Sequence, residues 1–139
     1  MRDSLCAGLR HRFVYRVPAS KTVPALYPEA PEFQQMPEVF ATGFLVGLVE
    51  WTCIQAVNPH LDWPREQTVG TRVELSHDAP TPPGCDVTVD VELVELDGRR
   101  LVFRAEARDD AATICQGRHE RFVIDRERFA ARLATRQKR

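Results

Sequence analysis

The sequence predicts an α+β fold in which a curled antiparallel sheet wraps around one long central helix. The first observation behind this prediction is the run 44–57, which is apolar at nearly every angle around a helix axis. The second is the series of alternating segments that follows it, separated by turn residues. Consecutive hairpins place neighbouring strands antiparallel, and only a strongly curved sheet can enclose a helix that is apolar all round.

Length and composition predict one domain spanning residues 1–139. The 19 basic and 20 acidic side chains leave a formal net charge of −1, which gives no electrostatic reason to bind nucleic acid. The four cysteines include no CxxC pair and the N-terminus has no apolar leader, so we expect free thiols and a cytoplasmic protein. We expect no metal site and no cofactor, since the motifs that bind them are missing from the sequence.

The N-terminal part predicts one strand followed by a proline-rich cover. Residues 10–17 place Phe13, Tyr15 and Val17 on one side of an extended segment. The next segment, about 18–40, contains five prolines and can form only short turns. Because it carries large apolar residues as well, we expect it to fold over another part of the molecule.

The part after the helix predicts a meander of four strands, at residues 67–77, 85–96, 99–109 and 113–124. The apolar alternation of the strand 85–96 changes phase near Leu93, which predicts a β-bulge. Asp97-Gly98 predicts the hairpin turn to the next strand. Asp125 is placed to cap a final helix that runs to about residue 136.

One strand, a cover, one buried helix and this meander together predict the hot-dog fold. A single sheet of this kind leaves an edge and part of the helix uncovered, so we expect two subunits to pair edge to edge in a homodimer. The apolar run carries Glu50 near its middle, and a charge there is costly in a bilayer. The run therefore predicts a core helix and no membrane span.

Glu50 is the first candidate functional residue, because it is the only charged residue between Thr42 and Val57. A carboxylate in an apolar helix is costly unless it is paired or protonated, and such environments produce catalytic acids and bases. The alternative is a structural glutamate in an ion pair or at a point where the helix reaches the surface.

Thr42, His77 and His119 are further candidates with two readings each. Thr42 stands at the predicted helix start, where its hydroxyl either caps the helix or joins a site. His77 ends a strand, and it is either a proton shuttle or a solvated histidine. His119 is open to the same two readings. The adjacent Glu120 does not form a metal motif with it, since neighbouring strand residues point to opposite faces.

Six short motifs follow one another along the chain: Lys21-Thr22-Val23, Leu26-Tyr27-Pro28-Glu29, Ala41-Thr42-Gly43-Phe44, Glu50-Trp51, Val69-Gly70-Thr71 and His119-Glu120-Arg121. Together they closely resemble the fluoroacetyl-CoA thioesterase family, and the likeness runs from about residue 8 to residue 130. The resemblance implies a dimeric hot-dog enzyme that hydrolyses short acyl-CoA thioesters.

By this resemblance, Thr42, Glu50 and His77 correspond to the family's catalytic set. Glu50 would attack the thioester carbonyl or activate water, Thr42 would position the reacting groups, and His77 would move the proton. Gly70 matches a glycine whose backbone N–H approaches the substrate oxygen. Arg121 matches an arginine near the acyl group, whose fixed charge would orient Glu50 or hold a polar end of the substrate.

The resemblance also implies that the segment 18–40 is a hydrophobic lid, whose substrate-facing residues correspond to Val23, Leu26, Phe33 and Met36. The family has a second phenylalanine where this chain has Met36. A flexible thioether does not reproduce the shape or the quadrupole of an aromatic ring, so the acyl selectivity is expected to differ.

Two alternatives to a thioesterase remain open at this point. The hot-dog scaffold also serves hydratases and dehydratases, and a non-catalytic protein that binds acyl thioesters would share the fold. Hydratases usually place a histidine near the central helix, whereas this helix carries Glu50 but no histidine. The sequence leaves open whether the thioester is a small-molecule acyl-CoA or is attached to a carrier protein.

Overall fold

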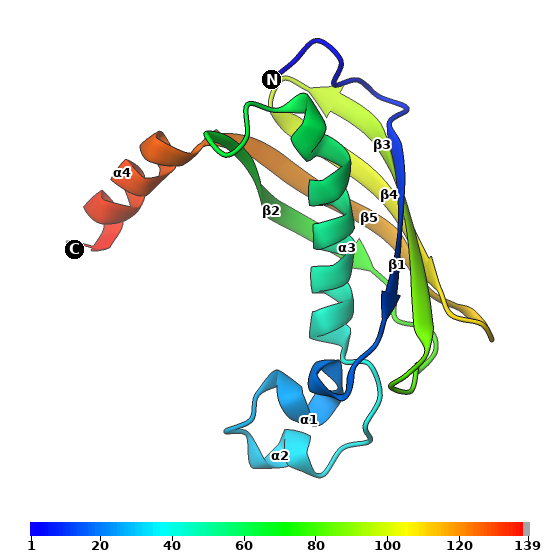
Figure 1. The fold of residues 1–139 in the computed structure, drawn as a ribbon. Helices are drawn as coiled ribbons and strands as arrows, with labels where there is room; N and C mark the ends of the chain where they lie inside the picture. The colour runs from blue at the N-terminus through cyan, green and yellow to red at the C-terminus, as the bar shows by residue number, and fades with distance from the viewer. Residues whose placement is uncertain (138–139) are drawn as a thin grey trace.

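The computed structural model describes residues 1–137, which form one curved five-stranded antiparallel sheet packed around a long helix (Figure 1). The helix, α3, spans Thr42–Val57. The strands are β1 (Arg10–Arg16), β2 (Glu66–Leu75), β3 (Asp86–Asp97), β4 (Arg100–Arg108) and β5 (Thr113–Asp125), in the spatial order β1-β3-β4-β5-β2. The predicted α+β class and the sheet curled around one helix are confirmed.

The core lies between α3 and the concave face of the sheet. Val49, Cys53 and Val57 recur along one side of the helix and are fully buried. The sheet contributes alternating inward residues, of which Leu93 and Phe103 are among the largest. This burial is what orients the helix, since its apolar surface has to face the curved sheet.

Several local features follow the sequence prediction closely. The register of β3 against β4 shifts between Leu93 and Glu95, where a bulge was expected, and Gly98 adopts a positive φ of 60° in the hairpin turn. The Asp125 carboxylate accepts hydrogen bonds from the backbone N–H groups of Glu127 and Arg128. It thereby caps the last helix, α4 (Arg126–Gln137).

Strand β2 differs from the prediction in its bounds and in its regularity. It ends at Leu75, two residues earlier than expected, and its register against β5 shifts between Gly70 and Arg72. Thr71 is the extra residue, so the apolar alternation that the sequence suggested is broken there. The strand lies at an edge of the sheet, and residues 70–74 are exposed.

The central helix is not enclosed on every side within this chain. Trp51, on the flank of α3 near β1, is 48% exposed, and its ring packs edge-on against Phe13. The expectation that one sheet leaves part of the helix uncovered is therefore confirmed for the single chain. Within residues 1–137 no helix is both long enough and apolar enough to span a bilayer.

The proline-rich segment contains only short helical turns, as expected: η1 (Ala19–Lys21), α1 (Val23–Leu26) and α2 (Pro31–Gln34). The segment lies beyond the first turn of α3 (Figure 1). Its two ends are held together by a bridge between Thr22 and Phe40, and the N–H of Phe40 donates to the carbonyl of Thr81. A short 3-10 turn, η2 (Asn58–His60), follows α3.

Candidate active site

Arg121 on β5 joins the sheet to the central helix. Its side chain points to the concave face and the residue is only 3% exposed. Its Nη1 donates to Oε1 of Glu50 on α3 at 2.9 Å. On β2, Nε donates to the Thr68 hydroxyl at 2.8 Å and Nη2 donates to the Thr68 carbonyl at 2.9 Å. A buried guanidinium is tolerated only with such partners, so its orientation is fixed by three elements.

The structure places Glu50 in an ion pair, and not alone in an apolar interior. The Glu50 side chain is 37% exposed, whereas its partner Arg121 is buried. One carboxylate oxygen is thus held by a charged donor, while the side chain stays partly exposed on the flank of the helix that lies against β2. A carboxylate oriented in this way can act on a molecule that reaches this flank.

Gly70 on β2 lies directly beneath this carboxylate. It pairs with Arg121 across the β2–β5 ladder. A Cβ atom added at Gly70 would lie 2.6 Å from Oε1 of Glu50, closer than a Cβ atom approaches a non-bonded oxygen. The glycine therefore allows the carboxylate to lie directly against the backbone of β2.

Thr42 and His77 form a second group, at the N-terminal end of the same helix. The Thr42 hydroxyl lies 2.7 Å from Nδ1 of His77. The N-cap position is occupied by Ala41, and Thr42 is the first helical residue. The capping reading of Thr42 is therefore wrong, and its hydroxyl is engaged with the imidazole.

Burial lowers the pKa of His77 below its usual value, and the nearby Asp78 carboxylate opposes that shift only in part. The imidazole is accordingly neutral at neutral pH. Its Nε2 atom is buried and has no hydrogen-bond partner among residues 1–137. A neutral imidazole with an unpaired nitrogen is chemically able to accept or relay a proton.

Within one chain the two groups do not meet. The structure brings Glu50, Gly70 and Arg121 together, and it brings Thr42 and His77 together. Thr42 and Glu50 are eight positions apart on the helix, which corresponds to about 12 Å along the axis. The two groups are therefore about two helical turns apart along α3.

The four predicted lid residues are placed differently from one another. Leu26 lies at the helix start, since its methyl carbons are 3.1 and 3.3 Å from the point that a Cβ atom added at Gly43 would occupy. The ring of Phe33 stacks on Tyr27, with centroids 5.8 Å apart. Val23 is half-buried and Met36 is 46% exposed. In this chain, Leu26 is thus the lid residue that contacts the start of α3.

Thr68 and His119 lie with Glu50, Gly70 and Arg121, and we call these five residues the Glu50 group. The sequence did not assign Thr68 or His119 to it. Thr68 accepts two hydrogen bonds from Arg121, and Nε2 of His119 lies 3.0 Å from Nη1 of Arg121. The available signal was the spacing of His119 and Arg121, since residues i and i+2 of a strand share one face. Nothing in the sequence pointed to Thr68.

Cys53 is excluded as a nucleophile. The thiol is fully buried beneath the helix, and this burial raises its pKa to about 12. A thiol with so high a pKa is almost entirely protonated at neutral pH and is a poor nucleophile.

Comparison with known proteins identifies the family. The fluoroacetyl-CoA-specific thioesterase family matches residues 24–127. The fluoroacetyl-CoA thioesterase of Streptantibioticus cattleyicolor is 49% identical over 133 residues, which cover 96% of this chain and 95% of that protein. The resemblance stated from the sequence motifs is confirmed.

Solved structures agree with this assignment. The fluoroacetyl-CoA thioesterase FlK is 49% identical, with a TM-score of 0.92 and 99% coverage of both chains. A thioesterase superfamily member from Thermus thermophilus is 26% identical, with a TM-score of 0.83 and 98% coverage of both chains. These matches confirm the hot-dog fold. The chain belongs to the fluoroacetyl-CoA-specific thioesterase family.

Proposed function

We propose that this protein is a thioesterase that hydrolyses a short-chain acyl-CoA, fluorinated or otherwise substituted, to the free acid and CoA. The observation that carries the proposal is the Glu50 carboxylate, which Arg121 holds against the backbone of Gly70 on an accessible flank of the helix. An oriented carboxylate beside a close backbone approach is the arrangement that acyl transfer requires.

In this proposal Glu50 either attacks the thioester carbonyl carbon or takes a proton from the water that attacks it. The backbone N–H of Gly70 stabilises the negative charge that develops on the carbonyl oxygen. The C–S bond then breaks, and the CoA thiolate leaves and takes up a proton. Thr42 positions the reacting groups and His77 moves the proton. If Glu50 attacks directly, water hydrolyses the resulting anhydride.

The substrate class is supported by the relatives. One structure of FlK, 47% identical with a TM-score of 0.92, is a complex with acetyl-CoA, and another contains fluoroacetate. The proposed lid residues Val23, Leu26, Phe33 and Met36 are apolar, which suits a small acyl group. Because one of these complexes contains acetyl-CoA, we propose that the thioester carrier is CoA and not a carrier protein.

We further propose that the enzyme is a homodimer in which two copies pair through β2. The strand is an exposed sheet edge that carries the exposed Val73, and the Glu50 group lies beside it. Pairing there would bring the Glu50 group of one copy to the Thr42–His77 pair of the other. We place the protein in the cytoplasm, where free thiols such as those of its cysteines persist.

Replacing Glu50 with Gln tests the proposal directly. The amide keeps the shape of the side chain but is neither a nucleophile nor a base, so hydrolysis of acetyl-CoA and fluoroacetyl-CoA should fall by about 100-fold or more. Release of free CoA thiol is the measurement. Glu106→Gln, on the exposed outer face of β4, is the matched control and should keep full turnover. Full turnover in the Glu50→Gln variant would exclude Glu50 from the reaction.

Replacing Met36 with Phe should increase the preference for fluoroacetyl-CoA over acetyl-CoA. An aromatic ring supplies a rigid surface with a defined quadrupole in place of a flexible thioether, and the expected gain in the ratio of kcat/KM is about 3- to 10-fold. The two kcat/KM values are measured side by side for both proteins. An unchanged ratio would show that residue 36 does not set the selectivity.

The pH dependence of His77 provides a third prediction. Its folded pKa lies below that of an unfolded histidine, about 6.5, because burial disfavours the imidazolium. The stability that neutral His77 contributes is therefore fully present above pH 6.5 and is lost as the pH falls through the folded pKa. An NMR titration of the His77 ring should show a midpoint below 6.5, and a midpoint above that value would contradict the structure.

A further inference from the structure

His119 is a buried histidine to which the proposed reaction gives no role. It lies on β5 two residues before Arg121, on the same concave face, and is only 1% exposed. Nδ1 of the ring lies 2.8 Å from the backbone carbonyl of Arg72 on β2. Nε2 lies 3.0 Å from Nη1 of Arg121. Both ring nitrogens are thus engaged, one with each of two strands.

The two partners determine the protonation state of the ring. A carbonyl oxygen can only accept a hydrogen bond, so Nδ1 of His119 must carry the proton. The guanidinium of Arg121 can only donate, so Nε2 must be the acceptor. The ring is therefore the neutral tautomer with its proton on Nδ1.

The environment favours this neutral form. Burial is the main cause that lowers the pKa of His119, and the charge of Arg121 lowers it further. The hydrogen bond to the Arg72 carbonyl and the carboxylates of Glu50 and Glu120 act in the opposite direction. Protonation of Nε2 would set one N–H group against another and place two positive charges in contact.

The hydrogen bond that Arg121 donates to His119 also constrains the position of Glu50. Nη1 of Arg121 carries two N–H groups, of which one is directed at Nε2 of His119 and the other at Oε1 of Glu50. The guanidinium is planar, so fixing one of these directions also fixes the other. Without the acceptor on His119, a buried N–H of Nη1 would lose its partner, and the bonds to Thr68 and Glu50 alone would hold the guanidinium.

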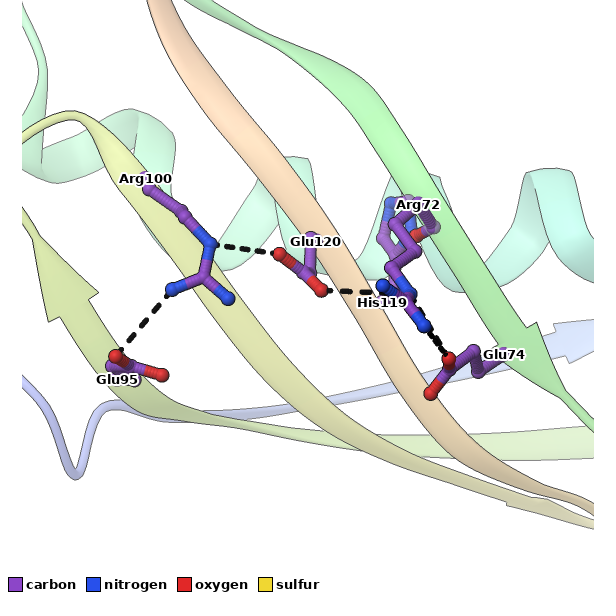
Figure 2. A network of polar contacts seen from close by, with 6 residues as sticks. All are labelled: Arg72, Glu74, Glu95, Arg100, His119 and Glu120. Atoms are coloured by element: carbon purple, nitrogen blue, oxygen red, sulfur yellow. Dashed lines mark hydrogen bonds and ion pairs between the residues drawn. The ribbon is translucent and has the colours of Figure 1, made fainter.

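The Arg72 carbonyl is itself held in place. Arg72 follows the bulge in β2, and its side chain lies on the outer face of the sheet, where it pairs with Glu74 and Glu120 (Figure 2). Glu120 also accepts from Arg100 at 2.8 Å. The ladder pairing of Arg72 with Glu120 holds the strand segment that supplies the carbonyl, and the outer ion pairs add to it, so the acceptor for Nδ1 of His119 is held in position.

We propose that His119 is a positioning residue for thioester hydrolysis, whose neutral ring orients Arg121 so that Nη1 holds the Glu50 carboxylate in its reactive position. This inference depends on the proposed function, since it assigns the reaction to Glu50. His119 itself does not contact the substrate.

Two substitutions separate the two hydrogen bonds of the ring. In His119→Gln the amide oxygen can occupy the place of Nε2 and accept from Arg121. In His119→Asn the amide nitrogen can occupy the place of Nδ1 and donate to Arg72, but nothing reaches Arg121. We expect His119→Asn to lower kcat by about 10- to 100-fold with little change in KM, and His119→Gln to stay within about threefold of the unmodified enzyme.

A purely structural role of His119 would give the opposite order of activities in the two variants. If His119 serves only to hold the bulge of β2, His119→Asn keeps the activity and His119→Gln loses it, and this result overturns the proposal. Full kcat in both variants overturns it as well. Thermal unfolding followed by circular dichroism checks that each variant is folded.

Two further outcomes are possible: both variants lose activity, or the unmodified protein has none. In both cases, hydrogen exchange of the Arg121 side chain, measured by NMR, decides. The Nε–H of Arg121 donates to Thr68 and should exchange slowly with solvent while the guanidinium is held. If both variants lose activity, faster exchange in both supports positioning, whereas unchanged exchange overturns it. If the unmodified protein hydrolyses no acyl-CoA, the proposed function fails by itself. The orientation of Arg121 is then tested by the exchange of its Nε–H alone. This exchange should be faster in His119→Asn than in His119→Gln, and equal exchange rates overturn the positioning role of His119.

Discussion

The structure depends on one ion pair, between Arg121 on the sheet and Glu50 on the central helix. A guanidinium that is almost completely buried must have its N–H groups paired, and four of them donate to Glu50, Thr68 and His119. Removing one partner of such a charge commonly costs several kcal/mol, because the other is left unpaired. This requirement ties one point of the helix to β2 and β5, in addition to the apolar packing that orients α3 against the sheet.

The same requirement explains features of β2 that are otherwise unfavourable. A glycine in a strand weakens it, yet any side chain at Gly70 would displace the carboxylate. The bulge at Thr71 interrupts the ladder, and the carbonyl of the next residue, Arg72, accepts from His119. Irregularities of this kind cluster beside functional sites, and here they lie directly beneath Glu50.

Much of the fold could be predicted because it rests on local patterns. Apolar alternation and its phase change located the bulge near Leu93, and the position of Asp125 identified the last cap. The ion pair could not be predicted from residue patterns, because the partner of Glu50 depends on how the helix lies against β5. The contact between Thr42 and His77 could not be predicted from residue patterns for a similar reason: a threonine at a helix start is usually a cap, and only the tertiary structure brings His77 to it.

The most direct test of this account is a double-mutant cycle on Glu50 and Arg121, with the rate of acyl-CoA hydrolysis as the readout. The variants are Glu50→Gln, Arg121→Met and the combination of both. If Arg121 acts by holding Glu50, the combined variant should be about as slow as Glu50→Gln alone, since an arginine with no carboxylate to orient has nothing further to contribute. Losses that multiply in the combined variant would contradict the account.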